Sequence, residues 1–398
     1  MTINPSKAKG SITAPPSKSM AHRHLICAAL ADGRSTIRNI DLSEDIKATI
    51  GCINQLGCNV TTGRDSIEVE QCGEVCSNPV FRCNESGSTL RFFIPIALVL
   101  CGRARFEGSD VLMSRPLTVY EDICRNQGIR FERGNGGIEV EGRIQSGTFK
   151  VPGNISSQFI TGLLFALPLL DGDSTIEITE SVESRPYIDM TIQVLNEFGV
   201  KVEWKNERTL AIKGNQEYRA CTSTVEGDYS NAAFLEAFNT IGGDVDVTGL
   251  NPDSLQGDKV YRDLFKLIEK GFCSIDISDC PDLGPVLMAV AALHNGARFT
   301  GTRRLKIKES DRGAAMCLEL SKFGVRTRLE ENEIVVEGCG ARTPDEPVCS
   351  HNDHRIAMSM AVMLSVTGGR LEGSGAVRKS YPGFFDDIGK LGVSITEE

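Results

Sequence analysis

The chain has 398 residues, too many for one ordinary hydrophobic core, so two domains are expected. Hydrophobic residues make up 40% of it and charged residues 24%, which is typical of a globular protein, and no segment is of low complexity. A net charge of −10 argues against nonspecific binding to nucleic acid, and the apolar runs are too short to cross a bilayer.

Two further features concern cellular location and metals. Residues 1–10 lack the apolar core of a signal peptide, which indicates a cytoplasmic protein. The 14 cysteines are scattered without a C-x-x-C pair, so we expect reduced thiols rather than a disulfide framework. His351 and His354 in "HNDHR" are the nearest approach to a metal-ligand grouping, and without further spaced ligands they predict no metal site.

Six copies of one unit follow each other along the chain. In each copy an apolar helix leads through a glycine turn into a strand, and an amphipathic helix then leads through a second glycine into another strand. Both glycine series advance by about 70 residues per step and share one shorter fourth step. Each glycine stands where a helix C-terminus favours a left-handed residue. The first series is Gly33, Gly102, Gly172, Gly242, Gly296 and Gly368, and the second is Gly57, Gly128, Gly199, Gly271, Gly324 and Gly392.

The two helix types differ in the surface that they can bury. Helices of the second type, such as the one ending in "SKFG", carry Lys, Glu and Asn on one face and should cover the outside of a domain. Helices of the first type, such as "RFFIPIALVL", are apolar on nearly all sides and should be buried. Six units thus divide into two domains of three. If the three buried helices of a domain are parallel, their N-termini face a common space.

The starts of the buried helices are rich in polar and basic residues. In chain order they read "PPSKSMAHR", "ESGSTLR", "GNISSQF", "EGDYSNA", "CPDLGP" and "HNDHR". Helix capping explains one polar side chain at each start, and it is the preferred interpretation for "EGDYSNA". Capping does not require the cations at these starts or in nearby loops, which include Lys18, Arg23, Arg91, Arg115, Lys308, Arg312, Arg355 and Lys379. Because helix N-termini and arginines both bind anions, we expect a cleft for a ligand with several negative charges.

Other anion-binding chemistries do not fit the sequence. Neither a G-x-x-x-x-G-K-[ST] loop nor a G-x-G-x-x-G motif opening a βαβ unit occurs. The acid–base candidates near the cations are Asp282 and Glu309, and the neighbouring positive charge favours the ionised form of both.

Nine ordered motifs resemble those of the 5-enolpyruvylshikimate-3-phosphate synthase family, from about residue 10 to residue 390. They are "PPSKSMAHR", "ESGSTLR", "SRPL", "NISSQF", "ESRPY", "PDLGP", "KESDR", "NDHR" and "KSYPGFFDD". The resemblance implies an α/β fold, the two-domain inside-out α/β barrel with six βαβαββ repeats. It also implies transfer of the enolpyruvyl group of phosphoenolpyruvate to the 5-hydroxyl of shikimate 3-phosphate, in chorismate and aromatic amino acid biosynthesis. This reaction releases phosphate through a tetrahedral intermediate, without metal or cofactor.

The resemblance also assigns roles to individual residues. Asp282 would accept the 5-hydroxyl proton, Glu309 is a candidate for protonating the methylene carbon, and Lys18 would contact both substrates. Ser156, Ser157 and Ser184 would hold the phosphate of shikimate 3-phosphate, Lys308 would help to fix its shikimate moiety, and Gln158 would lie between the two ligands. Ser19, Arg23 and Tyr187 are also expected to bind substrate. Those expected to bind phosphoenolpyruvate are Gly87, Arg115, Arg312, Arg355 and Lys379. Where the family pattern is not matched, at Glu85, Ser88 and Arg304, no contact is carried over.

By analogy with the family, residues 1–13 and 228–398 form one discontinuous domain and residues 14–227 form an inserted one. The active site is then expected in the cleft between them, where hinge closure would expel water. The expected protein is a cytoplasmic monomer that binds two small-molecule substrates, and neither nucleic acid nor a membrane.

Two alternative functions belong to different classes. The sister enolpyruvyl transferase that acts on UDP-N-acetylglucosamine usually carries a reactive cysteine on the loop before its "RP" motif, whereas "EGSDVLMSRP" has none. A noncatalytic protein that binds anions or RNA ends on a related fold would leave Asp282 and Glu309 without a chemical task.

Overall fold

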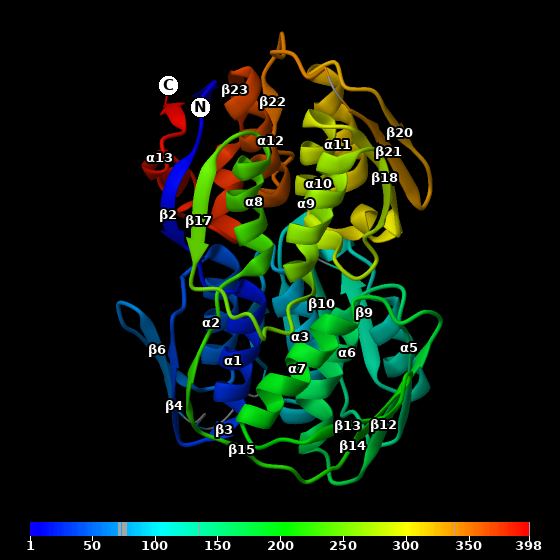
Figure 1. Cartoon of the computed structure of the whole chain (residues 1–398). Helices are drawn as coiled ribbons and strands as arrows, with labels where there is room; N and C mark the ends of the chain where they lie inside the picture. Colours follow the sequence, from blue (N-terminus) through cyan, green and yellow to red (C-terminus); the bar gives the residue numbers. More distant parts are fainter. Residues whose placement is uncertain (71–72, 74–77, 135, 339, 398) are drawn as a thin grey trace. The chain divides into compact units, whose positions relative to one another are not determined.

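The computed structural model describes residues 1–70, 73, 78–134, 136–338 and 340–397 (Figure 1). The chain divides into two compact units, one made of Met1–Ser17 with Gly227–Glu398 and the other of Lys18–Glu226. We call the first the discontinuous unit and the second the inserted unit. Each contains its own hydrophobic core. Among the described residues, no helix combines the length and the apolar character that a membrane span needs.

The core of the inserted unit is built on three helices that are buried almost throughout. They are α1 (Lys18–Leu30), α3 (Gly87–Leu100) and α6 (Ser157–Ala166). Three further helices bury only one face: α2 (Glu44–Gln55), α5 (Thr118–Asn126) and α7 (Arg185–Glu197). This division follows the two helix types expected from the sequence, because an evenly apolar helix needs cover on all sides. A short helix, α4 (Asp110–Ser114), precedes Arg115.

Three four-stranded sheets of the inserted unit share one topology. In each, the first two strands are parallel and the other two pairs are antiparallel. Their orders are β16 (Thr222–Thr224), β4 (Arg34–Arg38), β6 (Ser66–Glu70), β5 (Asn59–Thr62); β7 (Val80–Arg82), β8 (Arg103–Glu107), β10 (Gly137–Glu141), β9 (Arg130–Gly134); and β11 (Thr148–Pro152), β12 (Ser174–Thr179), β14 (Thr209–Ile212), β13 (Val202–Asn206). A short parallel pair joins β3 (Ala31–Asp32) to β15 (Tyr218–Arg219).

The discontinuous unit repeats the same pattern of helices. Its buried helices are α8 (Tyr229–Thr240), α10 (Gly284–Leu293) and α12 (His354–Thr367). Its amphipathic helices are α9 (Tyr261–Lys270), α11 (Arg312–Lys322) and α13 (Phe384–Lys390). Four 3-10 segments connect them: η2 (Gly257–Val260), η3 (Pro281–Leu283), η4 (Thr302–Ile307) and η5 (Ser374–Lys379).

The N-terminus completes a sheet of this unit. Strand β1 (Thr2–Asn4) lies between β23 (Gly369–Glu372) and β24 (Ser394–Thr396), and β22 (Val348–Cys349) pairs with β23 in parallel. Strand β2 (Lys9–Thr13) pairs in parallel with β17 (Asp244–Thr248). The remaining sheet has the order β18 (Cys273–Asp276), β19 (Gly296–Thr300), β21 (Glu333–Glu337), β20 (Thr327–Leu329).

The turn glycines meet the expectation of a left-handed backbone with one exception. Positive φ angles occur at every glycine of the two series except Gly172. At Gly172 the expectation of a left-handed backbone is wrong. A Cβ added there would crowd Ser146 Oγ, which would have to move.

Ten cysteines of the described residues carry free thiols, as expected. Cys58 is disulfide-bonded, so the expectation of reduced thiols is wrong at this position.

Candidate active site

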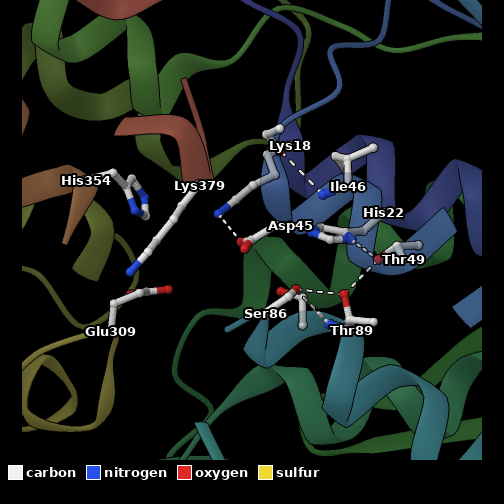
Figure 2. A network of polar contacts seen from close by, with 12 residues as sticks. Lys18, His22, Asp45, Ile46, Thr49, Ser86, Thr89, Glu309, His354 and Lys379 are labelled. Atoms are coloured by element: carbon white, nitrogen blue, oxygen red, sulfur yellow. Dashed lines mark hydrogen bonds and ion pairs between the residues drawn. The ribbon is translucent and has the colours of Figure 1, made fainter. Parts of the chain in front are cut away.

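The first residue of α1 is Lys18, and its ammonium group pairs with a carboxylate of the next helix. Lys18 Nζ lies 2.8 Å from Asp45 Oδ2 in the first turn of α2 (Figure 2). Ser43 caps α2 by accepting from Ile46 N, and this cap fixes the turn that carries Asp45. The lysine is therefore held in a defined place.

One turn further along α1, Arg23 is buried, and three hydrogen bonds hold its guanidinium group. It donates to Ser19 O at 2.6 Å, to Tyr187 O at 2.9 Å and to Thr191 Oγ1 at 2.9 Å. These bonds tie the start of α1 to the first turns of α7. Burial lowers the pKa of Arg23 to about 10, which leaves it a cation at neutral pH.

The first turns of α3 and α6 meet around Gln158. Its Oε1 accepts from Arg91 Nη1 at 2.6 Å, and its Nε2 donates to Ser88 Oγ at 2.9 Å. Gly87 begins α3 at the same place, and a Cβ on it would lie 2.8 Å from Arg115 Nη1 and 3.3 Å from Arg91 Nη1. Two guanidinium groups thus approach backbone that no side chain covers, an arrangement suited to a small anion.

The serines expected to bind phosphate stand at two helix starts. Ser156 caps α6 and accepts from Gln158 N, and Ser157 is the first residue of that helix. Ser184 precedes α7 in a left-handed conformation (φ 55°) and is buried. A non-glycine residue held in this region costs free energy, which a functional constraint can explain. Tyr187 lies in the first turn of α7, where its carbonyl accepts from Arg23.

In the discontinuous unit the cations gather around Asp282 in η3. Its Oδ1 lies 2.7 Å from Arg312 Nη1 and 3.1 Å from Lys308 Nζ, and its Oδ2 lies 3.7 Å from Arg355 Nη2. Burial raises the pKa of Asp282, but Lys308, Arg312 and Arg355 together hold it well below the usual range of a carboxyl group. This direction agrees with the sequence-based expectation of an ionised Asp282.

Arg312 joins three carboxylates at the start of α11. Besides Asp282, it contacts Asp353 Oδ2 through Nε at 2.8 Å and Glu309 Oε2 through Nη2 at 2.7 Å. The guanidinium group is almost completely buried. Burial alone would lower the pKa of Arg312, but these carboxylates raise it above its ordinary value, so its charge is permanent. Burial and the neighbouring arginines lower the pKa of Lys308.

The loop before α12 is fixed by a buried carboxylate. Glu319 Oε1 accepts from His351 Nε2 at 2.6 Å, and its Oε2 accepts from Cys349 N at 2.9 Å. His351 and Asn352 both adopt left-handed conformations, and Lys379 Nζ donates to Asn352 O. The side chains of Lys379 and Glu309 point toward one another (Figure 2). The predicted residues Asp282, Lys308, Glu309, Arg312 and Arg355 thus form one connected cluster, toward which Lys379 points.

Some residues of these clusters were not assigned from the sequence. They are Asp45 and Asp353, which hold cations expected to bind substrate. Arg91 was among the cations expected from the sequence, and the structure shows that it holds Gln158. Asp353 stands inside the "NDHR" motif, which was a usable signal, whereas nothing in "LSED" singles out Asp45. Arg185, by contrast, lies over the Trp204 ring at 4.4 Å and does not join the clusters.

Metal coordination has no candidate in the part of the chain that the structure describes. No group of three or more His, Cys, Asp or Glu side chains there is placed to hold a metal ion.

The sequence of the whole chain matches a known family. The model of the family described as EPSP synthase (3-phosphoshikimate 1-carboxyvinyltransferase) matches residues 3–388. The chain belongs to the EPSP synthase family. Proteins named 3-phosphoshikimate 1-carboxyvinyltransferase from Clostridium kluyveri and Clostridium beijerinckii are 42% and 44% identical to it, and each match covers 100% of this chain and 98% of the relative. The resemblance inferred from the nine motifs is thereby confirmed.

Solved structures show the same mixed α/β fold. EPSP synthase from Acinetobacter baumannii matches with a TM-score of 0.81 at 21% identity, over 99% of this chain and 98% of that one. The enolpyruvyl transferase NikO from Streptomyces tendae matches with a TM-score of 0.78 at 15% identity, over 99% and 97%.

Proposed function

We propose that this member of the EPSP synthase family transfers the enolpyruvyl group of phosphoenolpyruvate to the 5-hydroxyl of shikimate 3-phosphate and releases phosphate. The observation that carries the proposal, beside family membership, is the ionised Asp282 with Lys308, Arg312 and Arg355 around it. An ionised carboxylate can accept a hydroxyl proton, and three cations can bind and neutralise an anionic substrate beside it.

The addition step needs two side chains, one that accepts a proton and one that donates a proton. The substrate 5-oxygen attacks C2 of phosphoenolpyruvate, its proton passes to Asp282, and the methylene carbon receives a proton from the acid–base residue, for which Glu309 is the candidate. A tetrahedral intermediate results. Elimination then breaks the C2–O bond to phosphate. The leaving phosphate takes up the proton that Asp282 accepted from the hydroxyl, and the new methyl group returns a proton to Glu309, which restores the double bond. Arg312 and Lys379 lie beside Glu309 and favour its ionised form, so in this scheme Glu309 must take up a proton from solvent before it can protonate the methylene carbon.

The inserted unit supplies the remaining contacts in this proposal. Ser156, Ser157 and Ser184 bind the 3-phosphate, Gln158 lies between the two ligands, and Gly87 and Arg115 bind phosphoenolpyruvate. Lys18 contacts both substrates and exchanges Asp45 for them on binding. The serines stand at helix starts, where free N–H groups add to their hydroxyls.

The finer architecture belongs to the same proposal. Four sheets with one strand order, β7–β8–β10–β9, β11–β12–β14–β13, β16–β4–β6–β5 and β18–β19–β21–β20, support six βαβαββ repeats arranged three per domain as an inside-out α/β barrel. We propose a monomeric cytoplasmic enzyme that needs no metal or cofactor.

The deciding experiment measures phosphate release from phosphoenolpyruvate with shikimate 3-phosphate or with UDP-N-acetylglucosamine as the acceptor. We expect release with the first only. Release with the second would identify the sister activity. Calorimetric binding of shikimate 3-phosphate without any release would favour a noncatalytic binding protein instead.

A further inference from the structure

A chain of buried hydrogen bonds connects three helices of the inserted unit (Figure 2). His22 Nδ1 lies 2.8 Å from Thr49 Oγ1, Thr49 Oγ1 lies 2.7 Å from Thr89 Oγ1, and Thr89 Oγ1 lies 2.7 Å from Ser86 Oγ. All four side chains are buried, on α1, on α2, on α3 and at the cap of α3. Burying four polar groups in a hydrophobic interior costs free energy, which the hydrogen bonds between them offset.

The two hydrogen bonds that Ser86 accepts determine the direction of all the other bonds in this series. Ser86 Oγ caps α3 by accepting from Thr89 N, and it also accepts from Thr89 Oγ1. A hydroxyl group has one proton, so Thr89 must accept from Thr49. Thr49 donates its hydroxyl proton to Thr89, so it must accept from His22 Nδ1. The chain therefore requires the His22 tautomer that carries its proton on Nδ1.

The surroundings of His22 agree with a neutral ring. Burial, with Lys18 and Arg23 on the same helix, lowers the pKa of His22 well below its ordinary value. From the neighbouring helices it faces Thr49 on α2 and the ring of Phe92 on α3, at 6.4 Å between centroids. Among the described residues, Nε2 of His22 has no hydrogen-bond partner. A buried nitrogen without a partner is better tolerated as an acceptor than as an N–H donor, which also favours the proton on Nδ1.

This chain of hydrogen bonds lies beside two groups expected to bind substrate. His22 stands one helical turn after Lys18, and Thr49 one turn after Asp45, so the Lys18–Asp45 and His22–Thr49 contacts form two adjacent rungs between α1 and α2. At its other end the chain holds the Ser86 cap directly before Gly87. It thus links the lysine to the start of α3.

We propose that His22 is a positioning residue that, through a one-way chain of hydrogen bonds to Thr49, Thr89 and Ser86, fixes the start of α3 relative to Lys18. The proposal deepens the proposed function, since its kinetic consequence rests on phosphoenolpyruvate binding near Gly87.

The direct test is nuclear magnetic resonance of the whole protein with ¹⁵N-labelled histidine. The signals of His22 are assigned as those missing from His22→Asn. We expect a protonated Nδ1, an unprotonated Nε2 and no titration between about pH 5.5 and 8. A proton on Nε2, or titration near the ordinary histidine pKa, would overturn the chain.

The kinetic test compares Thr49→Val with Thr49→Ser. Valine has the same shape but no hydroxyl group, whereas serine keeps the hydroxyl group. We expect the Michaelis constant for phosphoenolpyruvate to rise roughly 3- to 10-fold in Thr49→Val, with a smaller change in kcat and in the constant for shikimate 3-phosphate, and to stay near wild type in Thr49→Ser. The positioning role would be contradicted if both variants had the same Michaelis constant for phosphoenolpyruvate. It would also be contradicted if the Michaelis constants for both substrates rose equally in Thr49→Val.

Two provisions keep the test decisive. If Thr49→Val does not fold, Thr89→Val and Thr89→Ser repeat the comparison one bond further on. If the wild-type protein transfers no enolpyruvyl group at all, the proposed function fails, while the tautomer still decides whether the chain exists.

Discussion

Asp282 is the base that accepts the 5-hydroxyl proton in the proposed reaction. Asp282→Asn keeps the shape of the side chain and an oxygen that accepts from Arg312, but it removes the base. We expect kcat to fall by about 10²–10⁴, the usual contribution of a positioned acid or base, while shikimate 3-phosphate still binds in calorimetry. Asp263→Asn, at an exposed carboxylate of α9, is the control for loss of one charge. Near-normal turnover of Asp282→Asn would remove Asp282 from the catalytic role.

Gly87 is surrounded closely enough for a single methyl group to matter. In Gly87→Ala the new Cβ would displace the Arg115 guanidinium group, which it approaches to 2.8 Å. Because loss of one hydrogen bond from a charged group costs about 1.5–3 kcal/mol, we expect the Michaelis constant for phosphoenolpyruvate to rise by roughly 10- to 150-fold. Gly51→Ala is the matched control, since nothing lies within 4 Å of a Cβ there. Similar constants in both variants would show that Gly87 does not border the binding site.

Asp258 makes stability depend on pH. Burial and the charge of Asp282 raise the pKa of Asp258 in η2 to about 6, against the opposing effect of Arg355. Between about pH 4 and 6 the native state keeps a proton that the unfolded state has released, so this carboxyl group lowers stability as pH rises. Asp258→Asn cannot ionise. Its stability relative to wild type should therefore increase from pH 4 to pH 7, by at most about 3 kcal/mol. Urea unfolding at both pH values measures this, and a pH-independent difference would contradict it.

The start of α12 depends on one side chain that serves two elements. Asp353 accepts from Arg355 N as the cap of α12 and pairs with Arg312 of α11. Asp353→Ala removes both contacts and leaves Arg312 partly unpaired, which should cost about 3–5 kcal/mol of stability. Asp353→Asn keeps the cap and should cost less. Circular dichroism during urea unfolding measures the loss, and a loss under 1 kcal/mol for Asp353→Ala would contradict this role.

Several elements could be predicted from the sequence because a local pattern determines them. The buried helices α3 and α10 are apolar on all sides, and the helix-ending glycines advance with the repeat. Helix capping was also predicted for "EGDYSNA", and Asp228 provides the cap of α8, which needs only the neighbouring N–H groups.

Other features depend on tertiary neighbours that no local pattern reveals. Ser146 approaches Gly172 closely, and Thr2 of β1 pairs with Arg370 near the other end of the chain. The bonds of His22 and of Glu319 cross between helices and loops in the same way. Motifs therefore indicated the residues expected to meet substrate, but not those that hold them in place.

The two units have separate hydrophobic cores, and only the inserted one is continuous in sequence. A fragment of residues 18–226 should therefore fold alone. Trp204, the single tryptophan of the chain, lies in this unit, where its Nε1 donates to Asp189 Oδ1 at 2.9 Å. We expect a cooperative loss of native tryptophan fluorescence on heating. A gradual, noncooperative change would contradict independent folding.

The matched comparison is a fragment of residues 227–398. It lacks β1 and β2, and β1 is an inner strand between β23 and β24. We expect this fragment not to fold until a peptide of residues 1–17 is added.

The most direct test of the proposed function uses purified protein, phosphoenolpyruvate and either shikimate 3-phosphate or its 5-deoxy analogue. The chemistry assigned to Asp282 needs the 5-hydroxyl proton, so phosphate should appear in a one-to-one ratio with consumed shikimate 3-phosphate, unaffected by a metal chelator, and should not appear with the analogue. Equal release with both compounds, or none with shikimate 3-phosphate, would contradict the proposal.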